Sequence, residues 1–243
     1  KKLYDFDLMK KGGHIAGYLI EKPMQEKIIA ALEKLGDIDA FNTKYGLKET
    51  SPLVYAMGDG NHSLATAKEF YEQKRENPDK DMSNALCRYA LVEIVNLHSP
   101  ALEFEAIHRI VTDVDTKALM SEMTAALELS EEKAEQAIVV CDNGTEKTLY
   151  IHKPTSKLTV GSLQNFLDSY IKEKGGKVDY IHGAEVIREL SAKENSIGFM
   201  LPDMGKEELF PTVIVDGALP RKTFSMGHAE DKRFYVEARK ILK

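Results

Sequence analysis

The sequence has few cysteines and no hydrophobic stretch long enough to cross a membrane. Only Cys87 and Cys141 occur in 243 residues. Both lie in apolar, strand-like stretches, so we expect buried free thiols rather than a disulfide or a metal pair. No apolar run approaches the roughly 18 residues of a membrane-spanning helix, and no signal-peptide core is present. These absences exclude a disulfide-stabilised secreted domain and a membrane protein, and they predict a cytoplasmic globular protein.

An excess of positive charge is also missing. The chain has 33 Lys and Arg against 39 Asp and Glu, a net charge of −6, with a pI near 5.7. A nucleic-acid-binding surface would show a basic stripe, so no nucleic-acid partner is expected. The one local exception is a basic C-terminal stretch, which is either an anion-binding surface or a solvated helix face. It comprises Arg221, Lys222, Lys232, Arg233, Arg239 and Lys240.

Several catalytic and binding motifs are absent. The chain has no Walker loop, no GxGxxG and no GxSxG, which argues against the standard nucleotide folds and a serine-hydrolase elbow. Its seven histidines are scattered without HxxxH or HxH spacing, and there is no CxxC. No metal-ligand set is therefore identified, although a carboxylate beside a phosphate could hold Mg²⁺ through water.

Hydrophobic periodicity predicts both strands and helices. Some strands follow one another directly and others are separated by helices, so we expect a mixed, largely antiparallel sheet with flanking helices, an α+β (mixed α/β) fold. The predicted strands are 14–20, 53–57, 85–95, 102–111, 137–142, 146–152, 178–182 and 197–201. The predicted helices are 23–35, 61–76, 115–128, 160–173, one between 183 and 196, 206–215 and 228–242, and 218–224 is expected to be extended.

Residues 1–243 are expected to form a single globular unit, with a subdomain boundary as an option at the charged stretch 129–136. The chain begins with Lys1-Lys2, without an initiator Met or a leader. We therefore expect the C-terminal part of a longer protein, in which upstream residues complete the site.

The most informative segment is the turn from Gly58 to Ser63, between a predicted strand and a predicted helix. Gly58 and Gly60 permit positive φ and close approach of a ligand, and the amides at the start of the next helix favour an anion. The turn also gathers Asp59 and His62 with an amide and a hydroxyl within five residues. The simpler alternative is an ordinary Asp-Gly turn with a helix cap.

His108 and Arg109 lie side by side in an apolar strand, where neighbouring side chains point to opposite faces. Arg109 could grip a phosphate with two hydrogen bonds, and His108 could act as an acid or base near neutral pH. Alternatively, one is an exposed charge and the other a structural histidine. The segment Leu219 to His228 gathers two cations, two hydroxyls and a histidine, as either an anion-binding ribbon or a charged surface loop.

Three segments, in this order along the chain, resemble the domain of unknown function 1015 family. They are the stretch from Gly58 to Ala67, Ile107-His108-Arg109, and Leu219 to Thr223. Family members carry a DGHHR-type motif followed by a helix, a PTHR-like strand and a PRKST-like segment. The resemblance covers nearly all of the chain and looks like the C-terminal portion of a longer protein, which agrees with its unusual start.

The first motif departs from the family pattern at two positions. Asp59, Gly60 and His62 fit, whereas Asn61 replaces the first His and Ser63 replaces the Arg. A strand-DGxHR-helix unit also resembles ParB and sulfiredoxin-type proteins, a group that binds nucleotides and includes a free-serine kinase. Members of the family in anaerobic bacteria are encoded beside phosphoserine-pathway enzymes. The resemblance thus implies phosphoryl transfer linked to serine metabolism.

We therefore predict an enzyme that binds a small anionic ligand, a phosphorylated metabolite or nucleotide, as a phosphotransferase that uses Mg²⁺ with ATP or ADP. The catalytic candidates are His62, Asp59 and His108. The ligand-binding candidates are Gly58, Gly60, Asn61, Ser63, Arg109, Arg221 and Lys222, with an arginine from the later segments replacing the charge lost at position 63. The alternatives are a non-catalytic module that senses an anionic metabolite, and a structural interaction domain.

Overall fold

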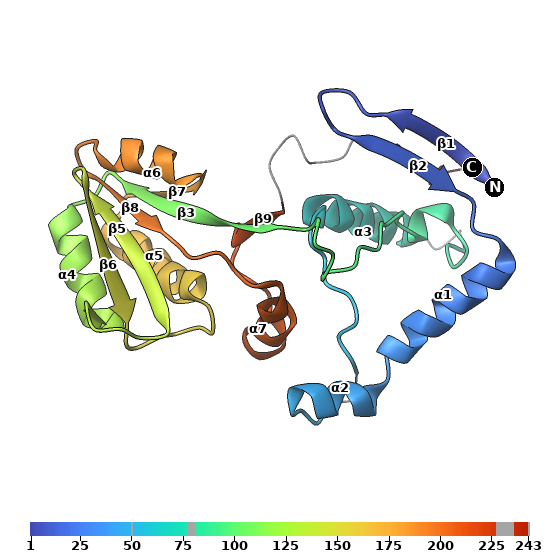
Figure 1. Ribbon diagram of the computed structural model, residues 1–243, viewed down its shortest axis with the longest axis horizontal. Coiled ribbons are helices and arrows are strands. Elements are labelled where there is room, and N and C mark those ends of the chain that lie inside the picture. Colours follow the sequence, from blue (N-terminus) through green and yellow to red (C-terminus); the bar gives the residue numbers. More distant parts are fainter. Residues whose placement is uncertain (50, 77–80, 227–235, 243) are drawn as a thin grey trace. The chain divides into compact units, whose positions relative to one another are not determined.

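The computed structural model describes residues 1–49, 51–76, 81–226 and 236–242 (Figure 1). The chain forms two compact units, one of Lys1–Ser99 with His228–Lys243 and one of Pro100–Gly227. The stretch 129–136, where we considered a subdomain boundary, lies inside the second unit. Among the described residues no helix has the length and apolarity to cross a membrane.

The first unit contains a hairpin and three α-helices. Strands β1 (Lys2–Asp7) and β2 (His14–Tyr18) pair in antiparallel fashion. They are followed by α1 (Lys22–Leu35), α2 (Ile38–Tyr45), α3 (Asn61–Arg75) and the 3-10 turn η1 (Leu86–Arg88). The predicted strand 14–20 and helix 23–35 are confirmed, with a proline in the first turn of α1. Helix α2 was not predicted, although Asp37 is a recognisable cap whose carboxylate accepts the Ala40 amide at 2.8 Å.

Three predictions in the first unit are wrong. Residues 53–57 and 85–95 contain no strand, although the predicted helix that follows Gly60 is present as α3. An apolar run predicts a strand only if another strand is available to satisfy its peptide groups, and no pairing with either run occurs in the described residues. In the predicted helix 228–242, residues 236–242 have no regular structure, and 228–235, including His228, lie outside the described residues.

The second unit contains a seven-stranded sheet in the order β4-β6-β5-β8-β3-β7, with β9 paired to β3. Every pairing is antiparallel. The strands are β3 (Phe104–Thr112), β4 (Leu129–Ser130), β5 (Gln136–Asp142), β6 (Thr145–Ile151), β7 (Lys177–His182), β8 (Ser196–Met200) and β9 (Phe224–Met226). The helices are α4 (Thr116–Leu127), α5 (Thr159–Lys174), α6 (Ala184–Ser191), the 3-10 turn η2 (Lys206–Glu208) and α7 (Leu209–Asp216). The predicted α+β fold with a largely antiparallel sheet is confirmed.

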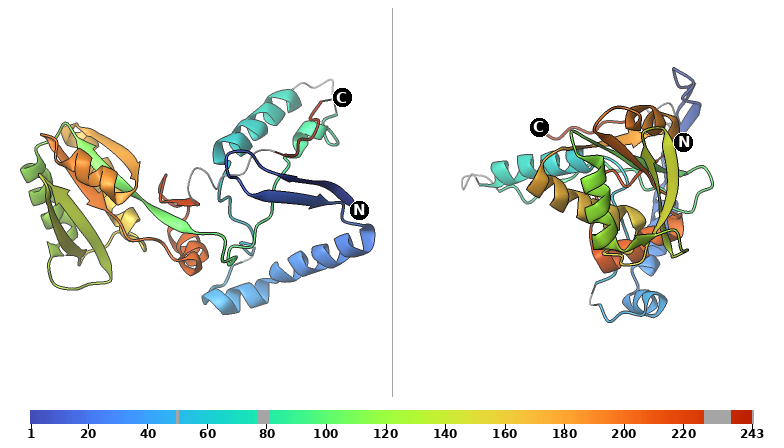
Figure 2. Two further views of the ribbon diagram at one scale, coloured as in Figure 1. Left: turned by 45° about the horizontal axis from the view of Figure 1, so that its top comes forward. Right: turned by 90° about the vertical axis from the view of Figure 1, so that its left-hand side faces the viewer.

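Alternate residues of β3 face different helices. Ile110 packs in a cluster with Cys141, Met200 and Ile187 of α6 on one face of the sheet, and Figure 2 shows α6 lying against that face. Arg109 points to the other face, where it contacts Gln164 of α5. In Figure 1 the first residues of β3 extend past the main sheet, and these are the residues that pair with β9.

The close approach of α6 to the sheet requires a glycine. A Cβ atom at Gly198 would lie 2.7 Å from Cγ2 of Ile187, well inside van der Waals contact. Gly198 lies in β8, whose five residues are all buried. Because Gly198 has no side chain, α6 can pack directly against β8.

Candidate functional site

Arg109 is fully buried, with 0% of its surface exposed. Its Nε donates to Oε1 of Gln164 at 2.8 Å. Its Nη1 donates to the carbonyls of Ile107 at 2.5 Å and Lys222 at 3.0 Å, and its Nη2 donates to the carbonyl of Arg221 at 3.3 Å. Burial lowers the pKa of the guanidinium from 12.5 to about 10, so it stays charged at neutral pH. The side chain therefore orders protein carbonyls rather than presenting its donors to solvent.

Two of the three carbonyls that Arg109 binds, those of Arg221 and Lys222, belong to the turn 220–223, which leads into β9. Oγ1 of Thr223 donates to the carbonyl of Pro220 at 2.7 Å, and the amide of Ile107 donates to the carbonyl of Thr223 at 3.4 Å. Lys222 has a φ of 53°, a left-handed conformation that costs a non-glycine residue free energy. Contacts from β3 on both sides of this strained residue hold the turn in place.

The turn places two cations over the ring of Tyr180, which pairs directly opposite Arg109 in β7. The distances to the ring centroid are 4.7 Å from Cζ of Arg109, 5.6 Å from Cζ of Arg221 and 5.3 Å from Nζ of Lys222. We call these four residues the Tyr180 cluster. Arg221 and Lys222 are exposed, and neither makes an ion pair with another described residue. Arg221 and Lys222 therefore hold positive charge at the surface with no acidic partner among the described residues, whereas Asp168 lies near the buried Arg109.

The hydroxyl of Tyr180 is buried and has no hydrogen-bond partner among the described residues. The face of the ring thus contacts the cations, while no group in the described ranges of the chain accepts or donates a hydrogen bond at its hydroxyl.

His108 points to the opposite face of β3 from Arg109, as expected for neighbours in a strand. Its Nδ1 accepts the amide of Leu201 at 3.2 Å, and burial lowers the pKa of the imidazole. The carboxylate of Asp203 lies near, and it accepts the amide of Ala106 at 2.7 Å. His108 is therefore half-buried with one ring nitrogen used by the main chain, and its proposed catalytic role remains a prediction.

An ion pair that the sequence did not predict lies on the face of the sheet that carries the Tyr180 cluster. Oε2 of Glu105, near the start of β3, contacts Nε2 of His182, the last residue of β7. His182 lies opposite Ile107 in the sheet register. The alternation of Tyr180 and His182 in the predicted strand 178–182 was the available signal, but it became informative only once β7 was known to pair with β3.

The turn from Gly58 to Ser63 lies in the first unit and is described by itself. Gly60 has φ 85° and begins α3, and the carboxylate of Asp59 accepts the Gly60 amide at 2.8 Å. The Leu64 amide bonds to the Gly60 carbonyl at 2.9 Å. No described side chain caps the helix, so its first amides point outward from an exposed end. Gly58, Asp59, Asn61, His62 and Ser63 are exposed.

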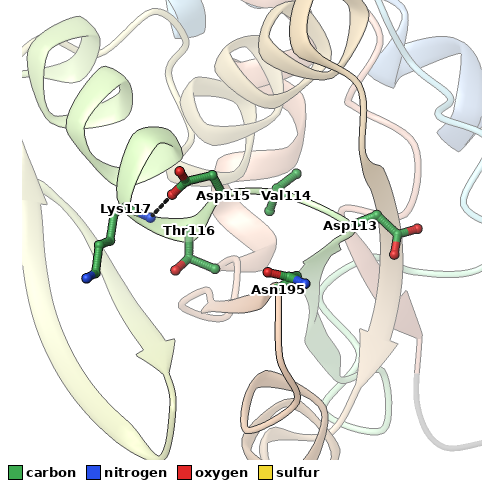
Figure 3. A pocket seen from close by; sticks show the side chains of 6 residues that line it. All are labelled: Asp113, Val114, Asp115, Thr116, Lys117 and Asn195. Atoms are coloured by element: carbon green, nitrogen blue, oxygen red, sulfur yellow. Dashed lines mark hydrogen bonds between the residues drawn. The ribbon is translucent and has the colours of Figure 1, made fainter.

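A pocket of about 530 Å³ lies at the N-terminus of α4 (Figure 3). Its acidic residues have structural partners, because the carboxylate of Asp115 accepts the amides of Lys117 and Ala118, and Asp113 pairs with Lys177 at 2.9 Å. None of the predicted site residues lines this pocket. Within the described part of the chain, no group of three or more His, Cys, Asp and Glu residues is placed to hold a metal ion.

Comparison with solved structures finds low similarity. A conserved hypothetical protein from Pyrococcus furiosus is 14% identical, with a TM-score of 0.46 over 70% of this chain and 69% of that chain. A free serine kinase variant in complex with ADP is 16% identical, with a TM-score of 0.49 over 86% and 81% of the two chains. SbnI with a C-terminal truncation, from Staphylococcus aureus, is 13% identical, with a TM-score of 0.44 over 70% and 62%.

Comparison with curated proteins finds no match. A family match covers residues 1–170, which include the 58–63 turn and all of β3, while the segment Leu219 to Thr223 lies beyond it. The match spans well over half of the sequence. The chain therefore belongs to the family described as protein of unknown function (DUF1015).

Proposed function

We propose that the protein binds a phosphorylated small molecule or nucleotide at the Tyr180 cluster. The observation that carries this proposal is that Arg221 and Lys222 are held beside a third cation, and no acidic residue in the described part of the chain pairs with either of them. Like charges at this separation repel, and the electron-rich ring offsets only part of that repulsion. A bound anion would remove the remainder.

Phosphate fits the two exposed cations better than a lone carboxylate does. Arg221 offers a planar fork of donors that matches a pair of phosphate oxygens, and Lys222 supplies a compact charge to a third. The strained backbone at Lys222 supports this assignment, because strain of this kind is maintained where the surrounding structure holds a group in a required position.

Arg109 acts in this proposal as a positioning residue. Its donors are used by Gln164 and by three carbonyls, so it fixes the turn that carries Arg221 and Lys222. We considered direct phosphate binding by Arg109. In this proposal Arg221, which is exposed, contacts the phosphate instead.

The 58–63 turn is proposed as a second anion-binding element, through the outward amides of Asn61, His62 and Ser63. In the more specific form of the proposal, the protein is a phosphotransferase linked to serine metabolism, with ATP or ADP and Mg²⁺. His62 is then the acid or base and Asp59 the partner of the metal or the hydroxyl. A non-catalytic sensor of an anionic metabolite differs from this enzyme in lacking turnover.

Calorimetric titration with inorganic phosphate, ATP and O-phosphoserine, each with and without Mg²⁺, tests the proposal. Replacing Arg221 and Lys222 together by Gln should weaken binding by tenfold or more, since two charge-assisted contacts are lost. The matched control replaces Lys133 and Lys193 by Gln, because these lysines are also exposed and also lack an ion pair among the described residues. An equal loss of ligand affinity in both variants would reject the Tyr180 cluster as the binding site. So would the failure of every ligand to bind the unmodified protein.

Turnover separates the enzyme from the sensor. Product formation from ATP that disappears in His62→Ala, with ligand binding retained, would support the phosphotransferase. Ligand-dependent thermal stabilisation without product would support the sensor.

A further inference from the structure

Asp168 of α5 is connected to the Tyr180 cluster through one buried amide. Nε of Arg109 donates to Oε1 of Gln164 at 2.8 Å, and Nε2 of Gln164 donates to Oδ1 of Asp168 at 2.8 Å. Because Nε of arginine can only donate, Oε1 of the amide faces the arginine and Nε2 faces the carboxylate. Gln164 is only 4% exposed, so a buried group fixes the position of this carboxylate.

Helix α5 crosses the sheet toward β7, the strand that carries the ring of the cluster. Near the N-terminus of the helix, Oγ of Ser162 donates to Oε1 of Gln136 in β5 at 2.8 Å. Further along, Gln164 contacts Arg109 of β3. The helix also packs against β7, and its C-terminal end leads into that strand. Asp168, one turn beyond Gln164, therefore lies on the side of Arg109 toward β7.

The charges around Arg109 have both signs. Burial has the largest effect on the pKa of Arg109 and lowers it, whereas Tyr180 and Asp168 raise this pKa and Arg221 lowers it. All three residues therefore lie close enough to the guanidinium to act on its charge. The acid is carried by α5 and the exposed cations by the turn 220–223, so the cluster has a negative group at its border as well as positive ones.

The carboxylate of Asp168 is accessible to a ligand. Asp168 is exposed, and apart from the bond to Gln164 its side chain makes no hydrogen bond or ion pair with another residue in the described parts of the chain. A carboxylate has about four acceptor positions on its two oxygens, and the bond to Gln164 uses one of them. Asp168 can therefore offset the buried charge of Arg109 and also accept hydrogen bonds from a cation in solution.

We propose that the ligand of the Tyr180 cluster carries an ammonium group beside its phosphate, and that Asp168 binds the ammonium while Arg221 and Lys222 bind the phosphate. This inference rests on the proposed function and deepens it, because it names the substrate class, a phosphorylated primary amine. A carboxylate beside two cations favours such a ligand over a phosphate ester without the amine, since it attracts the ammonium and repels further negative charge.

The experiment compares 2-aminoethyl phosphate with ethyl phosphate, which differs from it only in lacking the ammonium group. Affinities are measured by calorimetry at about pH 7.5, where a primary amine is protonated. In the unmodified protein we expect 2-aminoethyl phosphate to bind about tenfold more tightly, the effect of one charge-assisted hydrogen bond. Asp168→Asn keeps an acceptor for Gln164 but loses the charge. In this variant the two ligands should bind alike, and ethyl phosphate should bind at least as tightly as to the unmodified protein.

Glu173→Gln is the matched control, because Glu173 is an exposed acid of the same helix and pairs with Lys174 at 3.4 Å. This variant should keep the preference for the amine. Asp168→Lys should reverse the preference, so that ethyl phosphate becomes the tighter ligand, because the new cation repels the ammonium and attracts the phosphate. A variant that merely failed to fold would not show such a reversal.

A second readout follows the side-chain amide of Gln164 by NMR. 2-Aminoethyl phosphate should shift the resonances of this amide more than ethyl phosphate does, since Nε2 donates to the carboxylate that binds the ammonium. If the two ligands bind the unmodified protein equally, or if Asp168→Asn keeps the preference for the amine, the inference is wrong and the proposed function stands. If neither ligand binds and inorganic phosphate also fails to bind, the proposed function is wrong as well.

Discussion

Nη1 of Arg109 donates a 3.0 Å hydrogen bond to the carbonyl of Lys222, a residue 113 positions further along the chain. A buried cation thereby fixes the backbone that carries two exposed cations. The arrangement explains how Lys222 can maintain a positive φ without glycine, because the hydrogen bond to its carbonyl offsets part of the conformational cost.

Replacing Arg109 by Lys should release the turn 220–223. The lysine retains the charge but cannot reproduce the guanidinium hydrogen bonds to Gln164 and the three carbonyls. We therefore expect the free energy of unfolding of the second unit to fall by about 2–4 kcal/mol. The amide of Ile107, which bonds to Thr223, should exchange with solvent much faster. Hydrogen exchange measures this directly, with the exposed Arg188→Lys as the control. Unchanged exchange at Ile107 would show that Arg109 does not hold the turn.

Tyr180→Phe should either raise the free energy of unfolding or change it by no more than about 0.5 kcal/mol relative to the unmodified protein. The substitution removes a buried hydroxyl that has no partner among the described residues and keeps the ring that faces the cations. The free energy of unfolding is measured by urea denaturation. The transition is monitored through amide signals, which do not depend on tyrosine. A loss above about 1 kcal/mol would mean that the hydroxyl has a partner, such as a bound water.

Tyr180→Leu provides the contrasting change, because it removes the aromatic face. We expect phosphate binding to weaken in this variant, as the cations lose the ring that holds them together. Retention of full affinity would indicate that the ring only fills space.

The residues of the candidate site differ in how well sequence alone identifies them. Arg109, Arg221 and Lys222 stand out because cations in an apolar strand and after a proline are unusual, and the structure brings these three together. Tyr180 does not stand out, since an aromatic residue in a strand is ordinary. Its importance depends on the register that places it opposite Arg109, and register cannot be derived from a short strand with two polar ends.

The fold shows the same division between local and distant determinants. The hairpin around Asn143-Gly144 was predictable because both residues adopt the positive φ that a two-residue turn demands, 45° and 77°. The run 85–95 has an equally strong apolar pattern and yet contains no strand. Pattern alone does not reveal whether a pairing partner exists, and that is why local turns were predicted more reliably than isolated strands.

Gly198→Ala should destabilise the second unit by about 1–3 kcal/mol through overpacking. The added methyl would meet Ile187 of α6, which cannot retreat from a fully buried position. A double-mutant cycle with Ile187→Ala tests this reason, because removing the opposing atoms should recover part of the loss. If the changes in the free energy of unfolding of the two single variants simply add in the double variant, the strain does not arise from the contact with Ile187.

The β1–β2 hairpin of the first unit should depend on pH through His14. Its Nδ1 contacts Asp7 at 2.7 Å and its Nε2 contacts Asp5 at 2.6 Å, and these hydrogen bonds, that to Asp7 first, raise the pKa of His14 above 6.5. A raised pKa in the folded state means that the stabilisation is fully present below pH 6.5 and is lost as pH rises through the folded value. Titration of the ring by NMR should show the raised pKa and its reduction in Asp7→Asn. A ring that titrates identically in both would disprove the contact.

The pairing of β9 with the start of β3 has a consequence for synthesis of the protein. β3 leaves the ribosome near the beginning of the second unit, but its first residues remain without this partner until Phe224 to Met226 have been made. Arg109 meanwhile lacks two of the carbonyls that it will bind. The pairings of β3 with β7 and β8 need no residue beyond Met200, whereas the turn that carries Arg221 and Lys222 can be fixed only after β9 has been made.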